Sequence, residues 1–130
     1  MHQNKIVVFV CEHGAAKSII AASYFNKLAS ETNSDLRAIA RGTNPDQEIS
    51  PKTMLGLSDD GLAPTESTPQ KLSLTDLEPA QRIITFCELP VEYQNKVAIE
   101  QWDDIPPVSE NYEKARDAII ARLHLLINTK

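Results

Sequence analysis

The stretch KIVVFVCEHGAAKS, residues 5–18, decides the fold that this sequence predicts. Its first half is almost entirely β-branched or aromatic, which is typical of a strand buried on both faces of a parallel sheet. Residues 12–17 are mostly small and predict a loop, and apolar residues at helical spacing follow from Ser18. A strand, a short loop with a glycine and a helix, in that order, favour anion binding, because loop amides converge and the helix N-terminus adds a positive dipole.

The alternation of strands and helices continues along the chain. Further strands are predicted over residues 36–40, 82–87 and 97–102, helices over 50–60 and 110–128, and a minor helix or extended piece within 67–79. Strands that alternate with helices predict a three-layer α/β/α sandwich with a central parallel sheet of about four strands. The 130 residues contain no repeat and no linker, so a single domain over residues 1–130 is expected.

Composition and charge narrow the function classes. A net charge of -5 argues against binding to nucleic acid. No apolar run approaches the ~20 residues of a membrane helix, and the first residues lack the pattern of a signal peptide, so a cytoplasmic location without membrane contact is expected. The histidines His2, His13 and His124 show no metal-ligand spacing, and neither a metal nor another cofactor is expected.

The two cysteines, Cys11 and Cys87, each end a predicted strand. Because ligands of such sheets bind outside the carboxyl ends of the strands, both thiols are expected at that edge. A permanent disulfide between them is not expected in a reducing cytosol. The loop amides favour the thiolate of Cys11, and Ser18 either caps the helix or donates its hydroxyl to that thiolate. Gly14 allows the positive φ that a loop wrapped around an anion often needs.

Residues 8–18 resemble the phosphate loop of the low-molecular-weight protein tyrosine phosphatases and of the arsenate reductases built on the same fold, whose pattern is Cys, five residues, Arg, and then Ser or Thr. The resemblance covers nearly the whole chain in order. It includes a second strand and turn at 40–45, a strand ending in cysteine at 82–87, an acid loop at 102–107 and the last helix around 115–119. It implies that phosphate, arsenate or a phosphorylated substrate binds to the loop of Glu12, His13, Gly14, Ala15, Ala16, Lys17 and Ser18.

Three positions depart from the pattern of these families. Lys17 stands where they have Arg, and a lysine is a point charge on a flexible stem rather than a planar fork. Gly14 stands where they have Asn, which keeps the backbone freedom and removes the side-chain hydrogen bonds. Their general acid, an Asp directly before a proline, has a proline in its place here, and the nearest carboxylates, Asp103 and Asp104, come a few residues earlier.

The resemblance implies a cysteine-dependent phosphatase that hydrolyses phosphomonoesters of the phosphotyrosine type. Cys11 would attack phosphorus and form a phosphocysteine, while Lys17 and the loop amides stabilise the phosphoryl oxygens. Either Asp103 or Asp104 would protonate the leaving oxygen.

Two other functions stay open. In an arsenate reductase, Cys87 would attack the adduct of Cys11 with arsenate, and thioredoxin or glutathione would regenerate the thiols; the third cysteine usual in these enzymes is absent. The other alternative is a non-catalytic module that binds phosphate or another oxyanion, which the lysine at position 17 and the missing acid both favour.

Each candidate also has a purely structural interpretation. Both cysteines would then be buried small side chains, and Glu12, His13 and Lys17 would be solvated loop residues. Asp103 and Asp104 would be loop carboxylates or helix caps. Trp102 packs either in the core or as a wall of the substrate site.

Overall fold

A computed structural model describes residues 6–94 and 99–128. The strands are β1 (Ile6–Cys11), β2 (Arg37–Gly42), β3 (Ala80–Thr85) and β4 (Ile99–Gln101). The helices are α1 (Lys17–Glu31), α2 (Pro51–Asp59), α3 (Leu74–Leu77), the short 3₁₀ helix η1 (Val91–Tyr93) and α4 (Tyr112–Asn128). None of the helices in this part of the chain is long and apolar enough to cross a membrane.

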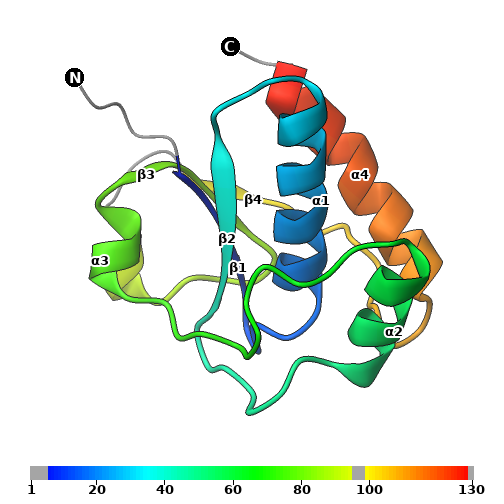
Figure 1. Ribbon diagram of the computed structural model, residues 1–130. Helices are drawn as coiled ribbons and strands as arrows, with labels where there is room; N and C mark the ends of the chain where they lie inside the picture. The colour runs from blue at the N-terminus through cyan, green and yellow to red at the C-terminus, as the bar shows by residue number, and fades with distance from the viewer. Residues whose placement is uncertain (1–5, 95–98, 129–130) are drawn as a thin grey trace.

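The four strands form one parallel sheet in the order β2-β1-β3-β4. Helices α1 and α4 cover one face of the sheet and α3 covers the other, as Figure 1 shows. The predicted α/β fold with a central parallel sheet is therefore confirmed. β1 lies inside the sheet and pairs with β2 on one side and β3 on the other, which is why its side chains are the most deeply buried.

The apolar run of β1 supplies both faces of the sheet. Val7 and Phe9 pack with the side chains of α1 and α4, whereas Val8 and Val10 pack with α3 and η1 on the opposite face. All four are at most 1% exposed. This is the alternation that a strand imposes on successive side chains, and burial on both faces explains why the run is continuously apolar.

Several boundaries differ from the predicted ones. The last helix begins at Tyr112 rather than 110, because the side chain of Asn111 accepts a hydrogen bond from the amide of Lys114 and so caps the helix. The third strand starts at Ala80 and ends at Thr85, two residues before Cys87. The predicted fourth strand is described only from Ile99 onward, and residues 97–98 lie outside the described residues.

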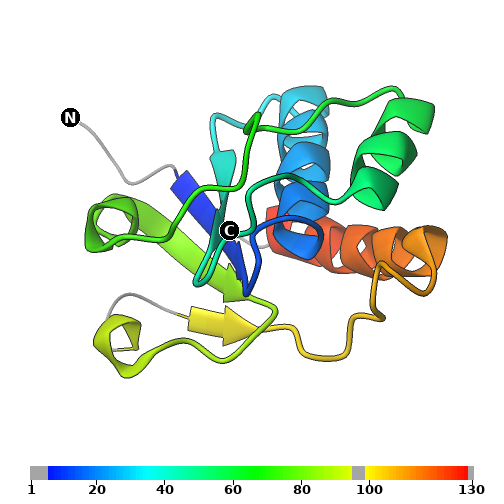
Figure 2. The same cartoon turned by 90° about the horizontal axis from the view of Figure 1, so that it is seen from below.

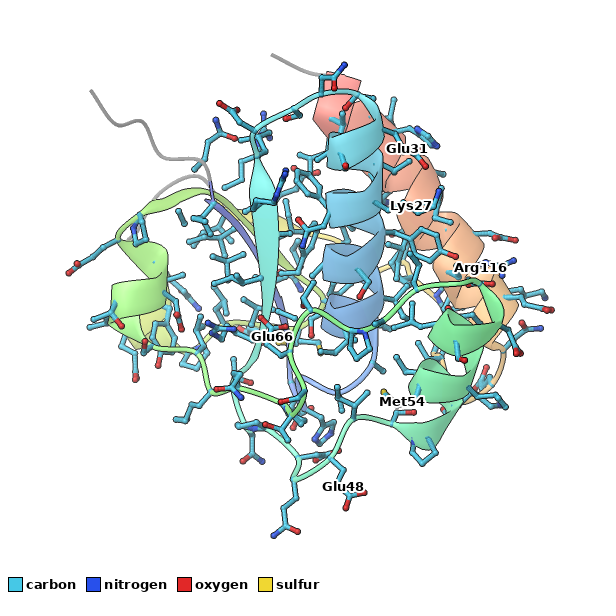
Figure 3. The ribbon with its side chains drawn as sticks, in the orientation of Figure 1. Lys27, Glu31, Glu48, Met54, Glu66 and Arg116 are labelled. Carbon is cyan, nitrogen blue, oxygen red and sulfur yellow. The ribbon has the colours of Figure 1, made fainter. Side chains whose placement is uncertain are left out.

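The outer edge of β2 is covered by the segment that precedes α3. Glu66 accepts hydrogen bonds from the amide of Ala40 and the guanidinium of Arg41, and Figure 3 shows Glu66 beside β2. The amide of Gly42 donates to Gln70, and the carbonyl of Gly42 accepts from Leu72. These bonds fix the carboxyl end of β2, on which the candidate site depends.

Candidate anion-binding site

The candidate site lies at the carboxyl edge of the sheet, where β1 ends at Cys11 and β2 ends at Gly42. These two residues are paired in the register of the two strands. Figure 2 looks onto this edge, where the loop after β1 lies beside the loop after β2. We call residues 11–18 the anion loop.

The carbonyl groups of the anion loop are turned toward the segment 43–50, which follows β2. Four amides of that segment donate to them: Thr43 to Cys11 at 3.2 Å, Asn44 to Glu12 at 2.7 Å, Asp46 to His13 at 3.0 Å and Ser50 to Ala15 at 3.0 Å. The segment 43–50 thus holds the outer side of the loop along most of its length.

The amides of the anion loop consequently face the other way. The described peptide bonds are all trans, and in a trans peptide the C=O of one residue and the N–H of the next point in opposite directions. The N–H groups that point away from the segment 43–50 are those of Glu12, His13, Gly14 and Ala16. Within the described residues none of these four donates to another protein group, so they are available to an anion.

Helix α1 adds its N-terminus to the same side of the loop. Its N-cap residue, Ala16, makes no side-chain capping bond, and its first turn carries no acidic residue. The N-terminal amides and the positive end of the helix dipole are therefore neither satisfied nor neutralised by a side chain of that turn.

Two glycines bring the anion loop and β2 into backbone contact. Gly14 has a φ of +60°, as its place in the sequence predicted. A Cβ placed on Gly42 would lie 2.7 Å from the amide nitrogen of Gly14 and 2.9 Å from its Cα. Any side chain at position 42 would therefore displace the loop. The importance of Gly42 was not predicted, because a glycine beside a turn gives no sign in the sequence of what it approaches.

The thiol of Cys11 lies at the base of the loop and contacts one hydroxyl. Its Sγ is 3.0 Å from the Oγ of Ser18, across a contact that is buried. Ser18 is completely buried and stands inside the first turn of α1, not at the cap. Of the two roles that the sequence left open for Ser18, the geometry therefore fits hydrogen bonding to the sulfur.

The side chain of Lys17 is hydrogen-bonded to a loop that is distant in the sequence. Its Nζ donates to the carbonyl oxygen of Ile105 at 3.1 Å. The side chain therefore bridges the start of α1 and the loop that follows β4. An ammonium group has three protons, so this bond leaves Lys17 able to donate to an anion as well.

Cys87 lies near Cys11 and is half-buried. Burial raises the pKa of its thiol, and the nearby Cys11 sulfur raises it further. A hydrogen bond with Thr43 and the charge of Lys17 act in the opposite direction. Cys11 ends β1 and Cys87 follows the neighbouring strand β3, so both cysteines lie at the expected edge of the sheet, and both thiols are free.

The acid loop, residues 102–107, provides no carboxylate that is held ready to act as the general acid the resemblance implied. Both carboxylate oxygens of Asp104 accept from the Arg122 guanidinium, at 2.6 and 2.7 Å. These hydrogen bonds lower the pKa of Asp104 and attach it to α4. Asp103 is exposed. Trp102 is 1% exposed and packs against Phe9, so it is a core residue and not an open wall of a substrate site.

His13 and Glu12 stand at the rim of the loop. The Nδ1 atom of His13 lies 3.1 Å from a carboxylate oxygen of Asp46, and its Nε2 atom lies 3.9 Å from Glu12. The side chain of His13 is 56% exposed. Asp46 was not predicted, because it lies in a turn 33 positions away that only the fold brings to the loop.

In residues 6–94 and 99–128, no group of three or more His, Cys, Asp or Glu side chains is placed to hold a metal ion. A small cavity of about 120 Å³ lies apart from the anion loop and is lined by Arg82, Glu100, Trp102, Arg122, Leu125 and Leu126.

No protein-family model and no curated protein matches the chain. Solved structures do match it. An arsenate reductase from Archaeoglobus fulgidus superposes with a TM-score of 0.75 and 23% identity, covering 93% of this chain and 98% of that chain. A low molecular weight protein tyrosine phosphatase from T. tengcongensis gives a TM-score of 0.82 and 19% identity, covering 96% and 99%.

A third similar structure is a mutant of the YwlE arginine phosphatase with a phosphorylated active-site serine, and YwlE comes from Bacillus subtilis. It gives a TM-score of 0.79 and 15% identity, covering 93% of this chain and 92% of that chain. The chain therefore has the fold that these phosphatases and arsenate reductases share. The resemblance inferred from the sequence is confirmed at the level of the fold.

Proposed function

We propose that this protein is a cysteine-dependent phosphatase that hydrolyses phosphomonoesters through a phosphocysteine at Cys11. One observation carries the proposal. The Cys11 sulfur, 3.0 Å from the buried Ser18 hydroxyl, opens a loop with four carbonyls bonded outward and four amides that donate to no other group of the described residues. A hydroxyl bonded to the sulfur stabilises the thiolate as nucleophile and as leaving group. The free amides stabilise the charge on the phosphoryl oxygens in the transition state.

The fold supports the same reaction. Structures of this fold include a protein tyrosine phosphatase and an arginine phosphatase whose active-site serine mutant carries a phosphoryl group. In this chain the corresponding step is attack of the Cys11 thiolate on phosphorus, with loss of the alcohol. Water then breaks the P–S bond and releases phosphate.

Hydrolysis of p-nitrophenyl phosphate tests this function. Wild-type protein is expected to release p-nitrophenol and, when quenched in acid during turnover, to carry one phosphoryl group on Cys11 by mass spectrometry. Cys11→Ser is expected to abolish turnover. Equal release by the wild type and Cys11→Ser, or no phosphoryl group on the wild type, contradicts the proposal.

A second candidate is arsenate reduction, which the two free thiols at the ends of the neighbouring strands β1 and β3 favour. The Cys11 thiolate would bind arsenic and expel hydroxide. Cys87 would then attack the Cys11 sulfur, so that arsenic leaves with two electrons as arsenite and the two sulfurs form a disulfide. A dithiol such as thioredoxin, or glutathione in the cytosol expected from the sequence, would reduce it.

Counting free thiols separates the two candidates. If the chain reduces arsenate, arsenate consumes both thiols of the wild type and leaves the single thiol of Cys87→Ser intact. If it is a phosphatase alone, arsenate leaves both thiols titratable. A chain that binds phosphate, forms no phosphocysteine and keeps its thiols in arsenate would instead be the non-catalytic anion-binding module.

A further inference from the structure

The proposed phosphatase lacks an evident proton donor. Departure of an alcohol from phosphorus needs a proton on the leaving oxygen, and the loop amides cannot supply one. Asp104 is paired with Arg122 through both of its oxygens, which lowers its pKa and keeps it ionised. A carboxylate held in this way accepts hydrogen bonds and is a poor acid.

The anion loop itself carries a titratable side chain in a fixed position. The carbonyl of His13 accepts the amide of Asp46 at 3.0 Å, and the Nδ1 atom of His13 lies 3.1 Å from the carboxylate of the same residue. Asp46 thus meets both the main chain and the ring of His13. This double contact restricts the ring relative to the loop. The Nε2 atom lies 3.9 Å from Glu12, beyond hydrogen-bond distance, so it is the ring nitrogen that can donate to a substrate.

Residues 12–14 directly follow the proposed nucleophile, Cys11, in the anion loop. His13 stands two positions after Cys11, and its ring is more than half exposed at the edge of the loop. The charged groups that contact the ring within the described residues are Asp46 at Nδ1 and Glu12, whose carboxylate lies 3.9 Å from Nε2. A carboxylate at Nδ1 orients an imidazole, as an aspartate does for the histidine of a hydrolase triad.

We infer that His13, positioned by Asp46, is the proton donor that replaces the missing aspartic acid of the acid loop; this inference rests on the proposed phosphatase function. As the Cys11 sulfur bonds to phosphorus and the P–O bond breaks, Nε2 of the imidazolium gives its proton to the leaving oxygen. The products are phosphocysteine, a neutral imidazole and the alcohol. The imidazole then takes a proton from water as that water attacks phosphorus, which releases phosphate and the Cys11 thiolate.

The test compares a poor and a good leaving group. Phenyl phosphate needs a proton on its leaving oxygen much more than p-nitrophenyl phosphate does. His13→Gln is expected to lower kcat/KM for phenyl phosphate by about 10²-fold, which is the low end of the effect of a general acid. The loss for p-nitrophenyl phosphate is expected to be only a few-fold. Asp46→Asn is expected to change the ratio of the two substrates in the same direction and by less, because it removes the positioning group and leaves the acid.

The matched control is His124→Gln, which removes an exposed histidine of α4 and is expected to leave both rates unchanged. Equal losses on both substrates in His13→Gln would overturn the inference, since they would indicate a role in binding or stability. A change of the ratio in Asp103→Asn, with none in His13→Gln, would assign the acid to Asp103 and also overturn it. Absence of phosphocysteine and of turnover in the wild type would overturn the proposed function itself, and the assignment of His13 with it.

Discussion

The ammonium group of Lys17 donates to the carbonyl oxygen of Ile105, 88 residues further along the chain, at 3.1 Å. The cation at the start of α1 is therefore anchored to the loop after β4 before any anion arrives. Ile105 is itself buried in the core, so this acceptor is held in place. A single lysine thus links two walls of the candidate site and also brings a positive charge to it.

Removal of that charge should weaken anion binding. Hydrogen bonds to a charged group contribute about 1.5–3 kcal/mol, so Lys17→Met is expected to raise the phosphate concentration that protects Cys11 from iodoacetamide by ~10-fold or more. Lys52→Met is the control. Lys52 lies on α2, and its ammonium group likewise donates to a backbone carbonyl, that of Ser109, at 3.0 Å. Equal phosphate protection in Lys17→Met and the wild type would show that Lys17 serves the loop contact alone.

The two serines buried on α1 make a second matched pair. Ser18 contacts the Cys11 sulfur, whereas the hydroxyl of Ser23 has no hydrogen-bond partner among the described residues. Ser18→Ala is expected to slow alkylation of Cys11 at neutral pH by ~10-fold, since the thiolate loses a donor. Ser23→Ala is expected to leave alkylation unchanged and to stabilise the fold slightly. A rate in Ser18→Ala that equals the rate in Ser23→Ala would argue against stabilisation of the thiolate by this hydroxyl.

The backbone contact between Gly14 and Gly42 should tolerate no side chain. In Gly42→Ala the new Cβ would lie 2.7 Å from the Gly14 amide nitrogen, so the loop must move. We expect the free energy of unfolding, measured by urea denaturation, to fall by about 1–3 kcal/mol, as for other overpacked sites. We also expect phosphate no longer to protect Cys11 from alkylation.

Gly61→Ala serves as the control for that substitution. Gly61 also has a positive φ, of +80°, yet nothing lies within 4 Å of its Cβ position. The free energy of unfolding of Gly61→Ala should fall by about 1 kcal/mol through backbone strain, and phosphate should still protect Cys11 in this variant. Intact phosphate protection in Gly42→Ala would mean that the loop adapts without losing its amides.

Asp60 joins three helices and gives the fold a dependence on pH. Its carboxylate accepts from Tyr24 at 2.5 Å, from Tyr112 at 2.9 Å and from Arg116 at 3.1 Å. Burial by itself would raise the pKa of Asp60, but the hydrogen bonds from the two tyrosines and the charge of Arg116 together lower it below 3.8. Because the pKa of the folded state is depressed, the stabilisation is complete above the unfolded pKa and is lost as the pH falls through the folded one.

Substitution of this carboxylate should therefore matter only when it is ionised. Asp60→Asn is expected to lower the free energy of unfolding by about 1–3 kcal/mol at neutral pH. The difference from the wild type should shrink as the pH is lowered below the pKa of the unfolded chain. The control is Asp59→Asn, because Asp59 is exposed at the end of α2. A deficit in urea denaturation that is the same at neutral and acidic pH would show that shape, not charge, holds the three helices.

Local patterns in the sequence were sufficient to predict the strands and the main helices of the fold. The apolar run of residues 5–11 predicted a central strand because burial on both faces requires apolar residues at every position. The helix predicted over residues 50–60 is α2, which begins at Pro51 with the Ser50 hydroxyl accepting from the amide of Thr53. The order of strand, glycine loop and helix indicated where an anion would bind, because helix N-termini and loop amides act over a few consecutive residues.

Only the tertiary structure decided which groups meet at that loop. The bond from Lys17 to Ile105, the approach of Gly42 to Gly14 and the contact of Asp46 with His13 each join segments whose separation in the sequence carries no periodic signal. The sequence predicted that a thiol would stand at the start of an anion-binding loop. Packing of the parallel strands determined its surroundings, because the register of β1 and β2 brings the segment 43–50 against the loop and turns its carbonyls outward.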